Sequence, residues 1–138
     1  MKKLICLVMA MIFTISFSAC GKKEESVLPA VEIDYETIYS DFFSNRVAGE
    51  QNHSGKNYKI SGAVVDAIWQ NYISLTIRFD NLYTKPGDIA GYTYNYVNIY
   101  YDETQLDTVA KLSVGDTISF EGVCENENIF NNCKIIIE

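Results

Sequence analysis

Apolar and polar positions alternate along the second half of the chain, most regularly in residues 72 to 80. Four apolar residues there occupy every second position, while Ser74, Thr76 and Arg78 occupy the positions between them. A period of two predicts a strand with one buried face. The inward positions are Ile73, Leu75, Ile77 and Phe79. The same period predicts five strands in all, at residues 58–69, 72–80, 92–101, 117–124 and 133–137.

The first of these strands carries Gly62 in its middle, and an internal glycine predicts a bend or bulge. Its apolar face is expected to hold Ile60, Val64 and Ile68. The other predicted inward positions are Val97, Ile99 and Tyr101, then Ile118, Phe120 and Cys124, and finally Cys133, Ile135 and Ile137. A long loop with Pro86-Gly87 is expected at residues 81 to 91.

Two segments have helical spacing instead. Ile38 and Phe42 recur on one face, and Asp34 can cap the start, so an amphipathic helix is predicted over residues 35 to 48. Gly49 and the polar run after it are expected to end this helix and to place His53 in a loop. A second helix is predicted over residues 103 to 112.

The order of these elements predicts the fold class. A mainly β chain with five strands, and a helix after the third strand, has the layout of an OB-fold-like Greek-key barrel, here preceded by an N-terminal amphipathic helix. Closing the sheet into a barrel removes most exposed strand edges. A five-stranded sandwich or an SH3-like barrel is the alternative that the pattern leaves open.

The N-terminus has the organisation of an export signal. Lys2 and Lys3 precede an apolar stretch over residues 4 to 17, which is shorter than the roughly 20 residues needed to span a bilayer. The run Ser18 to Gly21 resembles a lipobox, with Phe17 where that pattern usually has Leu. We therefore expect residues 1–19 to be a lipoprotein signal peptide and Cys20 to be lipidated. An ordinary secretory peptide and an uncleaved anchor are the alternatives.

This prediction sets the domain organisation and the location. Residues 20–33 are charged and lack periodicity, as is typical of a flexible tether, and residues 34–138 form the domain. The protein is then expected in the cell envelope, held to the membrane on its extracytoplasmic side by the lipid anchor.

Charge narrows the classes of partner. The chain has 11 basic and 18 acidic side chains and a net charge of −7. Nucleic-acid-binding proteins usually display a basic patch, and beyond Lys22-Lys23 the sequence has no cluster of Lys or Arg. No nucleic-acid partner is therefore expected.

The four cysteines divide by position. Cys6 belongs to the leader and Cys20 to the lipidation site, which leaves Cys124 and Cys133 as a pair in an oxidising compartment. A disulfide across the last hairpin is predicted, with residues 125 to 132 as the turn. A redox-active or metal-binding pair is the alternative, although the sequence has no CxxC and a single histidine.

Other chemistry-bearing groups favour structural roles. Asp102, Glu103 and Asp107 open a predicted helix, where acidic side chains favour the helix dipole. Glu125 and Glu127 could supply oxygen ligands to calcium, but the segment lacks the glycine and the distal glutamate of an EF-hand loop. The sequence also has no nucleophile motif of the GxSxG type. We expect no enzymatic activity, no metal and no cofactor.

Several short motifs resemble one family. They are Lys59-Ile60-Ser61-Gly62, Leu112-Ser113-Val114-Gly115-Asp116, Gly122-Val123-Cys124 and Asn132-Cys133. Together, over residues 34–138, they resemble the tRNA_anti-like OB-fold family found in bacterial lipoproteins. The resemblance supports the barrel and the cysteine pair. It implies no enzymatic activity and does not transfer tRNA binding to an acidic, exported protein.

A ligand surface is expected on the second and third barrel strands, which OB-folds use for oligonucleotides and oligosaccharides. The candidate ligand-binding residues are Tyr92, Tyr94, Tyr96, Tyr100, Arg78 and Thr76. Tyrosines in a row can stack on sugar rings or peptide, but they also stabilise exposed sheets without any ligand. The predicted function is a non-catalytic binding module for glycan or peptide. The alternative is a structural or assembly lipoprotein that acts through contacts with envelope proteins.

Overall fold

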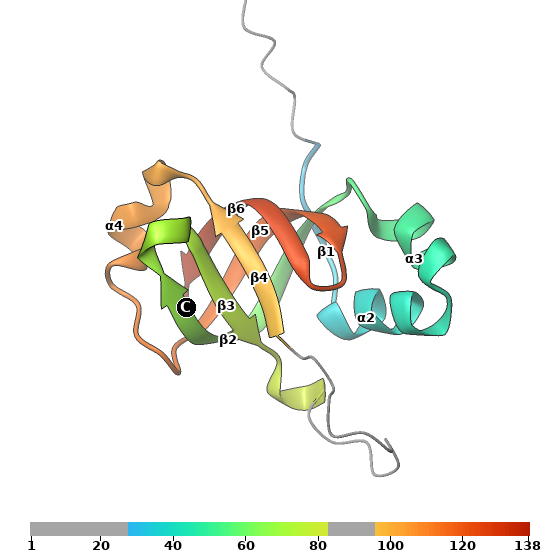
Figure 1. Ribbon diagram of the computed structural model, residues 1–138, viewed down its shortest axis with the longest axis horizontal. Coiled ribbons are helices and arrows are strands. Elements are labelled where there is room, and N and C mark those ends of the chain that lie inside the picture. Colours follow the sequence, from blue (N-terminus) through green and yellow to red (C-terminus); the bar gives the residue numbers. More distant parts are fainter. Residues whose placement is uncertain (1–27, 83–95) are drawn as a thin grey trace, which may run out of the picture.

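The computed structural model describes residues 28–82 and 96–138, which form a closed barrel with a helical cover at each end (Figure 1). The strands are β1 (Val31–Glu32), β2 (Asn57–Trp69), β3 (Ser74–Arg78), β4 (Tyr96–Tyr101), β5 (Thr117–Asn126) and β6 (Ile129–Ile137). The helices are α2 (Tyr35–Ser44), α3 (Arg46–His53) and α4 (Leu106–Val109). Short 3-10 turns lie at Gln70–Tyr72, Asp80–Leu82 and Glu103–Gln105.

The strand order is β1-β2-β3-β4-β6-β5, and a further pairing between β2 and β5 closes the sheet. Within the closed circuit β4 and β6 pair in parallel, whereas the other neighbours are antiparallel. The helix α4 follows β4 and precedes β5. This is the predicted five-stranded, OB-fold-like Greek-key barrel, which is therefore confirmed, and the closed circuit rules out the open sandwich.

The barrel interior is filled by the alternating side chains that the sequence pattern selects. Leu75, Ile77 and Phe79 are buried as predicted, and the register carries the same alternation into the neighbouring strand. Other side chains without solvent exposure are Ile60, Val65, Val97, Ile99, Ile118, Phe120, Cys124 and Phe130. Ile137, in contrast, was predicted to point inward and is 46% exposed at the end of β6.

A bulge in β2 confirms the prediction from Gly62 but changes which residues face inward. Gly62 has a φ of 74°, and the pairing with β5 shifts register between Ile60 and Ala63. One extra residue in a strand moves all later side chains to the opposite face. Ala63 and Val65 are consequently buried, in place of the expected Val64. A second register shift, between Val65 and Ala67, returns Ile68 to the inward side, where it lies opposite Leu75 and packs, partly buried, against the core.

The N-terminal helical segment is longer than predicted and is broken in two. Asn45 has an extended backbone and ends α2. Its side-chain Oδ1 accepts a hydrogen bond from the Ala48 amide at 3.2 Å, so Asn45 also caps α3. Gly49 was expected to stop the helix, but it lies inside α3. A Cβ at this position would lie 2.7 Å from Phe42 Cα, so the absence of a side chain lets α3 pack closely on α2.

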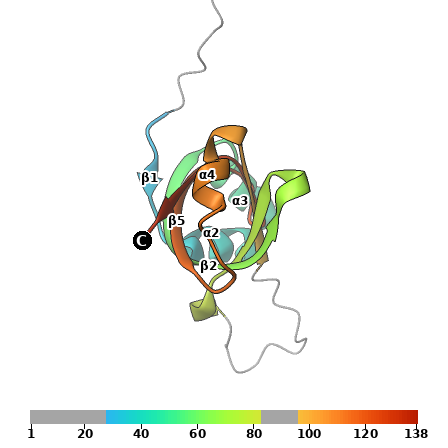
Figure 2. The same ribbon diagram turned by 90° about the vertical axis from the view of Figure 1, so that its left-hand side faces the viewer.

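The two ends of the barrel are covered by different helices. Figure 2 shows α4 in front of one opening, with α2 and α3 beyond the opposite one. At the latter end the Tyr35 ring stacks on Phe79 with centroids 4.3 Å apart, and its hydroxyl donates to the Glu127 carbonyl at 2.5 Å. The N-terminal helices therefore cover an end of the barrel and leave the outer face of β3 and β4 uncovered (Figure 1).

The described part of the predicted tether is attached to the barrel. β1 pairs in parallel with β2, with Val31 opposite Tyr58. Asn57 Nδ2 donates to the Leu28 carbonyl at 2.9 Å, and the Ile33 amide donates to the Lys59 carbonyl at 3.2 Å. Ordered contacts thus begin before Asp34, where the domain was expected to start.

Candidate functional site

The outer face of β2, β3 and β4 brings together residues that are distant in sequence. Three transverse rows cross it, each with its centre on β3. The first row is Trp69, Ser74 and Tyr100; the second is Ala67, Thr76 and Asn98; the third is Val64, Arg78 and Tyr96. We call this surface the β2–β4 face. It unites the end of the first barrel strand with the second and third strands.

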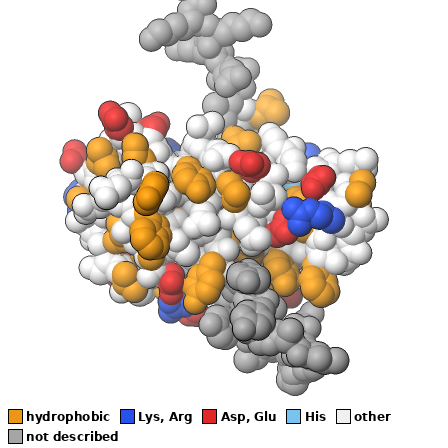
Figure 3. Space-filling model, in the orientation of Figure 1, with side chains coloured by type: hydrophobic (Ala, Val, Ile, Leu, Met, Phe, Trp, Pro, Cys, Tyr) orange, Lys and Arg blue, Asp and Glu red, His pale blue; other side chains and the backbone are white. Residues whose placement is uncertain are grey.

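Aromatic side chains dominate this face. Trp69 is 50% exposed, Tyr96 41% and Tyr100 39%, while Ser74 between Trp69 and Tyr100 is buried. Tyr72, in the turn before β3, is also exposed. Figure 3, in the same orientation as Figure 1, shows hydrophobic side chains gathered over β3 and β4, with most charged groups toward the margins.

A chain of hydrogen bonds links the three strands, from Trp69 in the first row to Thr76 and Asn98 in the second. The Trp69 indole Nε1 donates to Thr76 Oγ1 at 2.9 Å, and Thr76 Oγ1 donates to Asn98 Oδ1 at 3.0 Å. In this chain the indole can only donate, and the Thr76 hydroxyl accepts from it while donating its own proton to the Asn98 carbonyl oxygen. The chain therefore holds the Trp69 ring and the Asn98 amide in defined orientations.

Among the described residues of this face, the one cationic group is engaged by two carboxylates. Arg78 donates from Nε to Asp80 Oδ1 and from a terminal guanidinium nitrogen to Asp66 Oδ1, each at 2.9 Å. The hydrogen bond to Asp80, followed by that to Asp66, raises the pKa of the Arg78 guanidinium above its ordinary value. Two negative charges against one positive charge mean that Arg78 is not free to bind phosphate or carboxylate.

Four of the six residues predicted for ligand binding lie on the β2–β4 face: Tyr96, Tyr100, Arg78 and Thr76. Tyr92 and Tyr94 lie outside the described residues. Sequence reasoning missed Trp69 and Asn98. Trp69 is the single tryptophan of the chain and precedes the turn into β3, and the pairing across that hairpin was the signal that could have placed it here.

A second polar centre lies at the end of the barrel covered by α2 and α3. His53, predicted in a loop, ends α3 and is buried, with Nδ1 2.9 Å from the Tyr58 hydroxyl and Nε2 2.8 Å from Asp41 Oδ2. Burial, with smaller contributions from Cys124 and Asp41, raises the pKa of Tyr58. Both ring nitrogens have partners inside the protein, so the group ties the two helices to β2 and leaves no nitrogen for a substrate.

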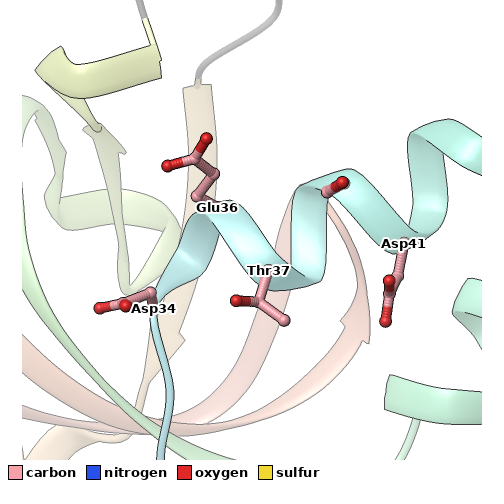
Figure 4. Close-up of a pocket in the computed structure, with 5 residues that line it drawn as sticks. Asp34, Glu36, Thr37 and Asp41 are labelled. Carbon is pink, nitrogen blue, oxygen red and sulfur yellow. The ribbon is translucent and has the colours of Figure 1, made fainter.

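An open, acidic hollow of about 480 Å³ lies along α2. Its lining residues are Asp34, Glu36, Thr37, Ser40 and Asp41. Figure 4 shows Asp34, Thr37 and Asp41 projecting from one side of the helix and Glu36 from another, so the carboxylates do not converge. Within residues 28–82 and 96–138, no three acidic, His or Cys side chains are grouped so that they could hold a metal ion.

The predicted Cys124–Cys133 disulfide is absent, and both residues are buried free thiols. The last hairpin turns tightly at Glu127 and Asn128, without the expected loop of eight residues. The resulting register pairs Cys124 with Phe130. Cys133 Sγ lies close to Gly122, 2.5 Å from the position that a Cβ atom on this glycine would occupy. Burial raises the pKa of each thiol to about 12, which keeps both protonated and unreactive.

Three further carboxylates, on Asp102, Glu125 and Glu127, have local partners. Asp102 Oδ1 accepts from the Thr104 amide at 2.8 Å and caps the turn that follows it. Glu125 accepts from Asn131 Nδ2 at 2.7 Å, and Glu127 Oε1 lies 3.2 Å from a terminal nitrogen of Arg46. These contacts fit the structural roles expected of these residues.

Comparison with known proteins assigns this chain to no family. No protein-family model matches the chain, and no curated protein matches its sequence. The resemblance to the tRNA_anti-like family stays a prediction. In the portion of the chain that the structure describes, every helix is too short or too polar to cross a bilayer.

Proposed function

We propose that the protein is a non-catalytic, OB-fold-like binding module, anchored by lipid to the extracytoplasmic side of a membrane, whose ligand lies on the β2–β4 face. The observation that carries this proposal is the open aromatic face itself: Trp69, Tyr96 and Tyr100 are exposed on a surface that none of the described helices covers (Figure 1). OB-folds bind extended ligands on this side of the barrel. A glycan or a peptide suits such a surface, because aromatic rings stack on both.

The anchor follows from the leader and from Cys20, which the sequence predicts to be lipidated. Leu28 is the first residue with a described contact to the barrel, eight residues after Cys20. Eight residues span at most about 28 Å when fully extended. A lipid on Cys20 would therefore keep the barrel close to the membrane surface, within reach of envelope glycans and proteins.

A binding panel tests the ligand face. The full chain, and a variant with Tyr96→Ala and Tyr100→Ala together, are compared on arrays of glycans and envelope peptides after circular dichroism has shown that both are folded. Phe43→Ala, at the far end of the molecule, is the matched control. Binding by the wild type and the control, lost in the double variant, is expected. Ligands that bind all three proteins equally would refute the proposed face.

Fractionation tests the anchor separately. The wild-type protein is expected to stay with membranes through a high-salt wash, and Cys20→Ala to be released. Wild-type protein found free of membranes would contradict lipidation at Cys20.

A second candidate function, assembly with other envelope proteins, is favoured by the helical cover. Phe43 on α2 is 75% exposed and Val47 on α3 is 64% exposed, and large apolar side chains on neighbouring helices are typical of protein contact sites. Phe43 also stacks on Tyr39, with ring centroids 5.9 Å apart. Concentration-dependent self-association that Phe43→Glu abolishes would support this function over ligand binding on the barrel.

A further inference from the structure

Trp69 is a preorganised aromatic group on the β2–β4 face. Its Nε1 is already bonded to Thr76 Oγ1 at 2.9 Å, yet half of the residue is exposed. A ring that is fixed before a ligand arrives loses little conformational entropy on binding. Since the N–H is used inside the protein, the ring surface is what Trp69 offers to a ligand.

Asn98 determines which polar group lies beside that ring. Its Oδ1 accepts the hydrogen bond from Thr76 at 3.0 Å, so the amide carbonyl is turned toward Thr76. The NH₂ end of the amide remains as the donor. A ligand on this part of the face must therefore present an oxygen acceptor next to an apolar ring surface, as a pyranose with hydroxyl or acetamido oxygens does.

The charge of the β2–β4 face bears on which class of sugar could bind there. Asp66 and Asp80 hold Arg78, and these three described groups together carry one excess negative charge. The chain as a whole carries a net charge of −7. Uronic acids and phosphorylated sugars would be repelled by this surface, whereas neutral sugars would not.

We propose that Trp69 and Asn98 form the primary subsite for one pyranose ring of a neutral oligosaccharide, with the ring stacked on the indole and an oxygen bound by the Asn98 amide. This inference rests on the proposed binding function and names its ligand class. Thr76 is a positioning residue, because it orients Trp69 and Asn98 together.

The spacing of the other rings predicts a dependence on chain length. Trp69 and Tyr100 are both in register with Ser74, so their backbones are two strand spacings, about 10 Å, apart. Tyr96 lies four residues from Tyr100 along β4, or about 14 Å. One sugar ring can contact the primary subsite only, whereas a longer chain reaches Tyr100 and then Tyr96.

Intrinsic fluorescence gives a direct readout, because Trp69 is the single tryptophan. The full chain, in a detergent without a sugar headgroup, is titrated with chito- and cello-oligosaccharides of one to six units and with oligogalacturonates of the same lengths. Calorimetry measures binding independently. We expect neutral oligosaccharides to change the Trp69 emission with the same Kd that calorimetry gives, and affinity to rise at least tenfold from one to four units.

Two variants separate the roles of the residues. Trp69→Ala is expected to weaken binding at least tenfold by calorimetry. Thr76→Val keeps the shape of the side chain, and we expect it to shift the Trp69 emission of the free protein and to weaken binding several-fold. Phe43→Ala is expected to bind as the wild type does.

Four results would count against the subsite. The first is that neutral glycans bind without changing Trp69 emission and bind Trp69→Ala equally well. This would place the glycan site elsewhere on the protein and leave a glycan-binding function intact. Tighter binding of oligogalacturonates than of neutral chains would refute the charge argument. Peptide binding on the face without any glycan binding would refute the ligand class alone, whereas no binding of either class would remove the proposed function as well.

Discussion

Two regions of the molecule contain similar side chains that differ in burial. One is the end of the barrel under α2 and α3, and the other is the β2–β4 face. The covered end buries Tyr35, His53 and Tyr58, whereas the open face exposes Trp69 and Tyr100. The hydrogen-bonded groups also differ, since both nitrogens of His53 are satisfied internally but the Asn98 amide keeps a donor available. Aromatic and polar residues are therefore buried and stabilise the fold where a described helix covers them, and similar residues stay exposed on the β2–β4 face.

The sharpest test of this comparison uses two adjacent phenylalanines of α2. Phe42 is 4% exposed and Phe43 is 75% exposed. Phe42→Ala should lower the free energy of unfolding by about 3 to 5 kcal/mol, because it leaves a cavity under the helices. Phe43→Ala should change it by less than about 1 kcal/mol. Urea unfolding curves measure both, and equal losses would mean that α2 is not docked as the structure shows.

Gly49 tests how closely the two helices pack. Alanine is the better helix former by about 1 kcal/mol, so Gly49→Ala would stabilise an isolated helix. In the protein its Cβ would meet the Phe42 backbone at 2.7 Å, and overpacking of this kind costs about 1 to 3 kcal/mol. We expect a net loss in stability, measured by thermal melting. A higher Tm would show that α3 can move away from α2 without cost.

A matched pair of tyrosines compares the hydroxyl groups of the two regions. Tyr58→Phe removes the partner of His53 Nδ1 at a buried position, and an unsatisfied buried group costs about 1 to 3 kcal/mol. Tyr100→Phe, on the open face, should change stability by no more than about 0.5 kcal/mol. Both are compared by chemical denaturation. A larger loss for Tyr100 than for Tyr58 would reverse the roles assigned to the two regions.

The last prediction concerns the two core thiols, whose effect on stability is absent at neutral pH and arises only above about pH 9. The pKa of Cys124 and of Cys133 is raised from 9.0 to about 12 by burial, so the unfolded chain releases these protons at lower pH than the folded protein does. The free energy of unfolding should therefore fall as the pH rises from about 9 toward 12. Melting curves at successive pH values measure this decline, and stability that increases across this window would contradict it.

Alkylation followed by peptide mass spectrometry provides the companion measurement on the thiols. At pH 8 both cysteines should resist the reagent in the folded protein and react after unfolding. Failure of either cysteine to react after unfolding without reductant would indicate the disulfide that the structure lacks.

The period-two pattern predicted the strands because each barrel strand faces the core with every second side chain. Leu75, Ile77 and Phe79 follow this rule without interruption. The helical spacing of Ile38 and Phe42 likewise identified the buried side of α2. Local patterns such as these depend on neighbours within a few residues of one another, and a sequence displays them directly.

What the sequence by itself determined is therefore the class of fold, the buried side of most elements and the aromatic character of β4. Only the tertiary structure decided the rest. The bulge at Gly62 reset the face of β2, and the tight turn at Glu127 and Asn128 set Cys124 opposite Phe130. The pairing of β2 with β3 and of β3 with β4 brought Trp69 beside Thr76 and Asn98. Register and burial under another element depend on contacts between distant parts of the chain, and a periodic pattern contains no information about them.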